Sequence, residues 1–93
     1  MTEPFTVEVA SAARRQLREL PDNIAMAIVE FVTLVLPENP LRLSKPLTGA
    51  LSGLRSARRG NYRVLIEVDE SDRRILAVRI AHRAHAYRPP ASD

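Results

Sequence analysis

The sequence predicts an α+β fold in which a small, antiparallel-rich sheet is covered on one face by a helical hairpin. Apolar residues alternate with a period of two near the N-terminus, recur at helical spacing through the middle of the chain, and alternate again from about residue 54. This order of patterns is β-α-α-β-β-β, in which strands and helices are segregated along the chain. With 93 residues and 45% hydrophobic content, the chain suits one core, so residues 1–93 are expected to form a single domain.

The first strand and the first helix follow directly from side-chain spacing. Residues 5–9 alternate between apolar and polar side chains, which is typical of a half-buried strand. Ser11 is expected to cap the helix that follows, and Pro21 marks its end. The apolar positions of this helix are Ala13, Leu17 and Leu20.

A second helix is expected to begin at Pro21 and Asp22, because proline is favoured in the first turn of a helix. Its apolar stripe consists of Ile24, Ile28, Phe31 and Val35, widened by Val32 and Leu34. The segment 37–40, which has a proline at each end, should terminate the helix. A loop from Leu43 to Gly53 is expected next.

Three strands are expected in the last third of the chain, at residues 54–58, 62–68 and 74–81, with a polar turn at 69–73. Even-numbered apolar residues of the last two strands should face the helices: Val64, Ile66, Val68, Leu76, Val78 and Ile80. The opposite face then carries Arg63, Leu65, Glu67, Arg79 and Arg83. If Val68 pairs with Leu76, Arg63 lies opposite Ala81 and diagonal to Arg83, about 7–8 Å away, which one phosphate could bridge.

Composition and charge restrict the class of protein. The chain has no cysteine, which removes disulfides, thiolate metal sites and thiol nucleophiles from consideration. Residues 1–9 lack the basic start and apolar run of a signal peptide, and no apolar stretch is long enough to span a bilayer. We therefore expect a cytoplasmic protein that does not enter the membrane.

Arginine dominates the basic residues and gathers in two segments. Residues 55–63 contain four arginines and no acid, and residues 79–88 contain three more together with both histidines of the chain. Guanidinium groups offer paired donors that match phosphate oxygens, so an anionic ligand such as nucleic acid is indicated. Solvated surface charge is the alternative interpretation of the same pattern.

Arginine stabilises charge but is a poor general base, so proton transfer needs another group. The candidates near the two segments are His82, His85, Tyr87, Lys45 and Glu67. His82 shares its parity with the core-facing residues, which favours a structural role. His82 and His85 lack further ligands nearby, so neither a metal site nor a cofactor is expected.

Four segments together resemble the RelE/ParE superfamily of bacterial toxin–antitoxin systems, and especially its RelE-like RNA-cleaving members. They are residues 43–47 (LSKPL), 51–54 (LSGL), 58–66 (RRGNYRVLI) and 82–87 (HRAHAY). The resemblance implies a metal-independent endoribonuclease that cleaves mRNA in the A site of the 30S ribosomal subunit and is silenced by a cognate antitoxin. It implies attack of the RNA 2′-hydroxyl on the adjacent phosphate, which gives a 2′,3′-cyclic phosphate and a 5′-hydroxyl.

The resemblance also assigns roles to individual residues. Arg63 and Arg83 match arginines that stabilise the phosphate, Tyr87 matches a C-terminal tyrosine implicated in base stacking or proton transfer, and Arg58 matches a basic residue on the preceding strand. The residues expected to contact RNA are Lys45, Arg55, Arg59, Arg79, His82, His85 and Arg88.

The chain departs from the family pattern at three positions. Ser56 stands where many relatives have a second basic residue, His85 where they often have glutamate, and Ala84 where they often have arginine. A ParE-like toxin that inhibits DNA gyrase without nuclease activity, and a catalytically weak RNA-binding member, therefore remain as alternatives.

Overall fold

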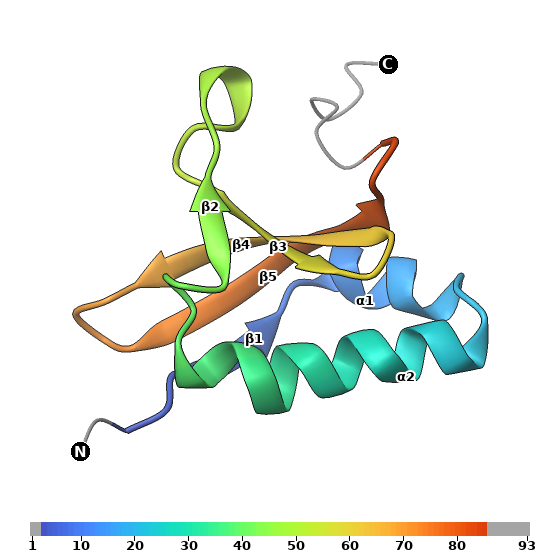
Figure 1. Ribbon diagram of the computed structural model, residues 1–93, viewed down its shortest axis with the longest axis horizontal. Helices are drawn as coiled ribbons and strands as arrows, with labels where there is room; N and C mark the ends of the chain where they lie inside the picture. The colour runs from blue at the N-terminus through green and yellow to red at the C-terminus, as the bar shows by residue number, and fades with distance from the viewer. Residues whose placement is uncertain (1–2, 86–93) are drawn as a thin grey trace.

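The computed structural model describes residues 3–85, which form a five-stranded sheet with two helices on one face (Figure 1). The strand order is β1-β5-β4-β3-β2, in which β1 runs parallel to β5 and the other neighbours are antiparallel. The strands are β1 (Thr6–Val9), β2 (Ser44–Pro46), β3 (Arg55–Arg59), β4 (Tyr62–Asp69) and β5 (Arg74–His82). The predicted α+β class and helical hairpin are confirmed. None of the helices within residues 3–85 is long and apolar enough to cross a membrane.

Helix α1 (Ser11–Arg18) follows β1 after a single residue and packs against β5. The expected cap at Ser11 is wrong, because Ala10 occupies the N-cap position and no side chain caps the helix. Ala13 is fully buried, and Gln16 accepts a hydrogen bond from the backbone N–H of Ile80 at 2.7 Å. Since β1 pairs with β5 only as far as Ala77, Gln16 satisfies a donor on the part of β5 beyond the end of β1.

Helix α2 (Asp22–Glu30) begins after Pro21, as predicted, and continues into a π-helical turn, Phe31–Val35. The wider turn shifts the apolar stripe by one residue. Leu36 is fully buried in the core, whereas Val35 is 47% exposed and Leu34 is 68% exposed. The prediction that Val35 and Leu34 belong to the buried stripe is therefore wrong, because it assumed that the α-helical period continues through residues 31–35.

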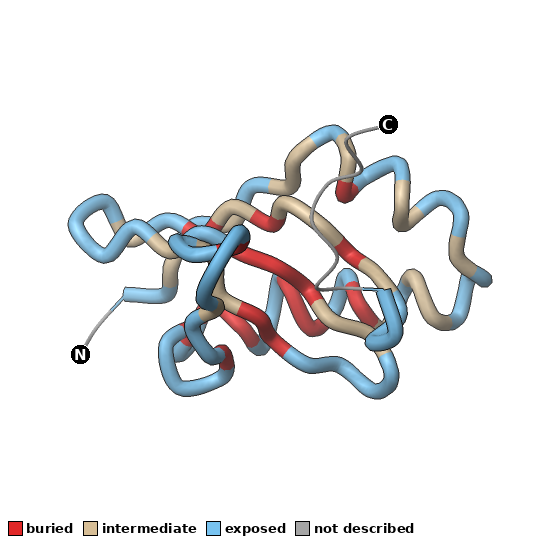
Figure 2. The backbone as a smooth tube through the Cα atoms, turned by 90° about the horizontal axis from the view of Figure 1, so that it is seen from above, coloured by how far each residue is buried: buried red, intermediate tan, exposed pale blue. Residues whose placement is uncertain are grey.

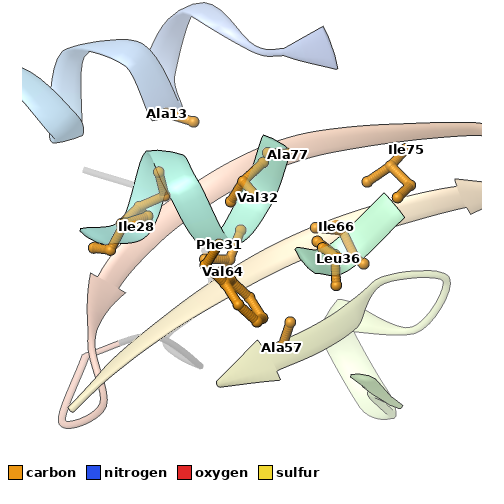
Figure 3. Close-up of a cluster of buried hydrophobic side chains, with 11 residues drawn as sticks. Ala13, Ile28, Phe31, Val32, Leu36, Ala57, Val64, Ile66, Ile75 and Ala77 are labelled. Carbon is orange, nitrogen blue, oxygen red and sulfur yellow. The ribbon is translucent and has the colours of Figure 1, made fainter. Parts of the chain in front are cut away.

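The core lies between the helices and the sheet. Figure 3 shows side chains from α2 and the turn after it directed toward those of β3, β4 and β5. The buried cluster consists of Ala13, Ile28, Phe31, Val32, Leu36, Ala57, Val64, Ile66, Ile75, Ala77 and Ile80. In Figure 2 the buried backbone follows the central strands, while the outer turns are exposed. The core thus fixes which face of each strand remains for function.

The register between β4 and β5 changes partway along the strands. Arg63 lies opposite Ala81, as predicted, but Leu65 and Ile66 pair with Arg79 and Ala77, which leaves Val78 unopposed as a bulge. Val68 therefore pairs with Ile75 and not with Leu76 as predicted. The bulge exchanges the two faces of β5, so Ile75 and Ala77 enter the core in place of Leu76 and Val78.

The segment expected to be a loop from Leu43 to Gly53 contains β2, which pairs with β3. In Figure 1, β2 and the turn after it rise from the sheet on the side opposite to α2. Leu65 faces this side, as predicted, yet it is fully buried, and Leu51 in the turn is also buried. The face turned away from the helices is therefore partly covered, and its residues border a groove beside β2.

Candidate anion-binding groove

Two arginines lie directly opposite one another on the face turned away from the helices. Arg58 of β3 pairs with Arg63 of β4, one step from the hairpin turn at Gly60 and Asn61. Gly60 has a φ of 61° and is the first of the two turn residues, which suits a type II′ turn and explains the tight connection. Side chains in directly opposed positions lie about 4.5–5.5 Å apart at Cβ, and like charges there are destabilising. An anion bound between the two guanidinium groups would offset this repulsion.

The arginine pair lines a groove of about 470 Å³ between the sheet and the segment around β2. Arg63 is half-buried, and its Nη1 atom is buried, whereas Arg58 is exposed. Arg58 donates from Nε to the carbonyl oxygen of Gly60 at 3.3 Å. The groove is lined by Arg42, Leu43, Ser44, Lys45, Pro46, Leu47, Ser56, Arg58 and Arg63. Four of these side chains are cationic and none is acidic, so the groove favours a negatively charged ligand.

The pairing of β2 with β3 brings Lys45 into the groove, because Lys45 lies opposite Ser56. A short hydrogen-bond network holds this wall. Arg55 donates from Nε to Ser44 Oγ at 2.7 Å, and from Nη2 to the carbonyl oxygens of Ser44 at 3.0 Å and Leu41 at 3.1 Å. The Ser44 hydroxyl in turn donates to the carbonyl oxygen of Pro40. The guanidinium of Arg55, expected to contact RNA, is thus used to join β3 to the segment before β2.

Arg79 and Arg83 extend the basic face beyond the groove. Arg79 lies opposite Leu65 on the neighbouring strand, and the backbone N–H of Arg83 donates to the carbonyl oxygen of Asn61 at 2.8 Å. This last bond continues the ladder past the end of β5, so Arg83 lies diagonal to Arg63, as the predicted register required. The bulge at Val78 lies on the other side of Arg79 and leaves this part of the register unchanged.

Two other predicted RNA contacts lie on the helix side of the sheet. Arg59 lines a separate pocket with residues of α2 and the hairpin turn. His82 packs its ring edge against Tyr62, with ring centroids 5.5 Å apart and an interplanar angle of 83°. The structure does not bring Arg59 or His82 to the groove. Successive side chains of a strand point to opposite faces of the sheet, and these two belong to the face that packs against the helices.

The remaining predicted site residues are placed as follows. His85 is exposed in the turn after β5, where its N–H donates to the carbonyl oxygen of His82 at 2.8 Å. Tyr87 and Arg88 lie outside the described residues. Glu67, a candidate base, lines a pocket with Glu8 and Asp69, beyond the bulge and away from the arginine pair. Within residues 3–85, no group of three or more histidine or acidic side chains is arranged to hold a metal ion.

Arg42 was not identified from the sequence, although it lines the groove beside Lys45. It lies in a turn two residues after Pro40 and belongs to no periodic pattern. Only the pairing of β2 with β3 places this turn beside the arginines, and a three-residue strand that contains a proline gives little signal. The one sequence signal that could have indicated Arg42 is the charge distribution, because residues 39–66 contain no acidic residue.

The chain is similar to known proteins over most of its length. Residues 7–87 match the model of a protein family described as ParE toxin of type II toxin–antitoxin system, parDE. The chain is 47% identical over 85 residues to Toxin RelE of Mycobacterium tuberculosis, and the aligned region covers 91% of this chain and 88% of that protein. It is 45% identical over 85 residues to Toxin RelG of the same organism, which covers 91% and 98%.

A solved structure is similar over most of the fold. The toxin–antitoxin complex RelBE2 from Mycobacterium tuberculosis matches with a TM-score of 0.83 and 42% identity, covering 86% of this chain and 99% of the matched chain.

Proposed function

Because the chain belongs to the ParE toxin family of type II toxin–antitoxin systems, within the RelE/ParE superfamily, we propose that this toxin is a metal-independent endoribonuclease. Its substrate is mRNA in the ribosomal A site. The observation that carries the proposal is the directly opposed pair Arg58 and Arg63 on the wall of a cationic groove. A phosphodiester bound between the two cationic side chains would offset their mutual repulsion.

The proposed reaction is attack of the RNA 2′-oxygen on the adjacent phosphorus. The 2′-hydroxyl loses its proton, a bond forms from O2′ to phosphorus, and the bond from phosphorus to the 5′-oxygen of the next nucleotide breaks. That oxygen takes up a proton, which leaves a 2′,3′-cyclic phosphate and a 5′-hydroxyl. The transition state carries one more negative charge than the substrate, so fixed cationic donors stabilise it more than they stabilise bound RNA.

We assign this stabilisation to Arg63 and Arg58, with Arg83 acting from the diagonal position. Arg63 is the most constrained of the three because it is half-buried on a central strand, and a rigid donor loses little freedom on binding. Among the described candidates for proton transfer, Lys45 lines the groove, whereas His82 and Glu67 do not. We propose that Lys45 donates a hydrogen bond to a phosphate oxygen or to the leaving oxygen. Tyr87 remains the proposed C-terminal participant.

The proposed partner in the resting cell is an antitoxin, as in the RelBE2 complex to which this fold is similar. The outward side of α2 and the turn after it exposes apolar side chains that a monomer would otherwise leave in water: Met26, Val29, Leu34 and Val35. An amphipathic antitoxin segment could cover them. We therefore propose that the antitoxin lies along α2, on the side of the sheet opposite to the groove.

The test is to incubate the purified toxin with programmed ribosomes and to map the mRNA ends, in parallel with a gyrase supercoiling assay. We expect A-site cleavage that chelators do not inhibit. Replacing Arg63 or Arg83 by alanine should slow cleavage by about 10²-fold or more, because each removes a donor to the developing charge. Intact mRNA together with inhibited gyrase would show that the toxin acts on gyrase instead.

A further inference from the structure

The groove has two chemically different walls. The sheet contributes Arg58 and Arg63, whereas the segment around β2 contributes the apolar side chains of Leu43, Pro46 and Leu47. We propose that this apolar wall is a nucleobase subsite, which holds the base of a nucleotide whose phosphate lies on the arginine pair. The inference rests on the proposed function, since it assigns a part of the same groove to a part of the RNA.

The size of the groove supports a ligand larger than phosphate. Its volume of about 470 Å³ lies within the range of about 300–1,000 Å³ that is typical of sites for small organic ligands. A phosphate group held by Arg58 and Arg63 would fill only a part of this volume. The remaining space is bordered by Leu43, Pro46 and Leu47, so it suits the flat, largely apolar face of a base.

Exposure points to the same wall. Leu43 is 37% exposed although it lies in a groove with four cationic side chains. Covering this apolar surface with the apolar face of a ligand would be favourable. An inorganic anion would leave it uncovered, whereas a nucleotide supplies an apolar face and a charge together.

The wall is held rigid, which a selective subsite requires. Ser44 is 6% exposed and accepts from Arg55 while it donates to the carbonyl oxygen of Pro40. On the other side of the wall, the backbone N–H of Leu47 donates to the carbonyl oxygen of Leu54 at 2.9 Å. These bonds fix both ends of the segment that carries the three apolar side chains. We therefore propose that Arg55 acts as a positioning residue for the subsite.

The experiment measures coupling between the wall and individual bases. Ribosomes are programmed with an mRNA that carries 2′-deoxy nucleotides in the A-site codon, so that the mRNA cannot be cleaved and toxin binding can be measured. The bases of this codon are then removed one at a time by abasic substitution. For the wild-type toxin, we expect loss of one base to weaken binding by about tenfold, while loss of the others has little effect.

Leu43→Ser should weaken binding to the complete codon by about the same factor and should abolish the sensitivity to that one base. Leu43→Met, which keeps the side chain apolar, should behave as the wild type. Leu41→Ser is the matched control, because Leu41 is 38% exposed but does not line the groove, and it should leave binding and the sensitivity to each base unchanged. Leu47→Ser is a second variant of the wall with the same expected pattern. Thermal unfolding shows that each variant is folded.

The outcomes separate the two proposals. If Leu43→Ser and the base deletion weaken binding independently, so that their factors multiply, the wall does not contact a base and the subsite is excluded. If the wild-type toxin does not bind programmed ribosomes, or if Arg63→Gln binds them as tightly as the wild type, the proposed function itself fails, and the subsite fails with it.

Discussion

The opposed arginines Arg58 and Arg63 make a prediction that separates electrostatic strain from ligand binding. Arg58→Gln keeps a long polar side chain and removes one of the two charges. Arg59→Gln is the matched control, since it removes the same charge from the next residue of β3, on the other face and opposite Tyr62. Any general effect of lowering the net charge of +3 is common to both variants.

The magnitude follows from the pairing. If the two guanidinium charges lay as close as opposed Cβ atoms, about 5.5 Å apart, they would repel by about 0.8 kcal/mol in water and about 3 kcal/mol at an effective dielectric constant of 20. Because Arg58 is exposed, the value for water applies, and solvent screening lowers it further. Arg58→Gln also loses the hydrogen bond to Gly60. Salt at 1 M screens the repulsion, since the screening length is then about 3 Å. We therefore compare the free energy of unfolding of Arg58→Gln with that of the wild type, and expect this difference to favour Arg58→Gln by about 0.5 kcal/mol more at low salt than at 1 M salt.

Urea unfolding is the assay, since urea is uncharged and the salt concentration can be varied independently. The same proteins are then titrated with single-stranded RNA over a range of salt. Arg58→Gln should lower the salt slope of binding by about 0.7, which corresponds to one phosphate contact, and Arg59→Gln should leave the slope unchanged. Equal salt dependence of stability in the two variants, or an equal loss of slope, would show that the arginine pair has no special role.

Three further predictions concern the fold. Leu36→Ala should lower the free energy of unfolding by about 3 kcal/mol, whereas Val35→Ala should change it by less than about 1 kcal/mol; equal losses by urea unfolding would exclude the π-helical turn. Gln16→Leu should cost about 1–2 kcal/mol because it removes the acceptor for the Ile80 N–H, and Gln16→Glu, which keeps an acceptor, should cost less; thermal melting compares the two. Gly60→Ala should cost about 1 kcal/mol because of its positive φ, and an unchanged melting temperature would argue against this turn.

The sequence predicted the elements of the fold well because each depends on local periodicity. The first strand, the start of α2 after Pro21 and the strands expected at residues 54–58 and 62–68 agree with the structure to within one residue. The errors arise where the period changes within an element. The π-helical turn replaces Val35 by Leu36 in the core, and the bulge at Val78 replaces Leu76 by Ile75.

The candidate site was predictable in part for the same reason. Alternation along β3 and β4 separates Arg58 and Arg63 from their neighbours once one face is known to pack against helices. Arg42 depends on the long-range pairing of β2, and the use of Arg55 in hydrogen bonds depends on the position of Ser44. Neither follows from spacing along the chain, because both require the tertiary structure.

The bulge at Val78 also limits how this strand can change in length. On one side of it, odd-numbered residues Ile75 and Ala77 fill the core, and on the other side odd-numbered Arg79 faces away from the helices while Ile80 is buried. Deleting Val78 would make the ladder regular, but it would also turn either the core residues or the arginine to the wrong face. We expect deletions of one residue in β5 to be rejected wherever both the core and the basic face must be kept, so that homologues vary in length at the turns and not within this strand.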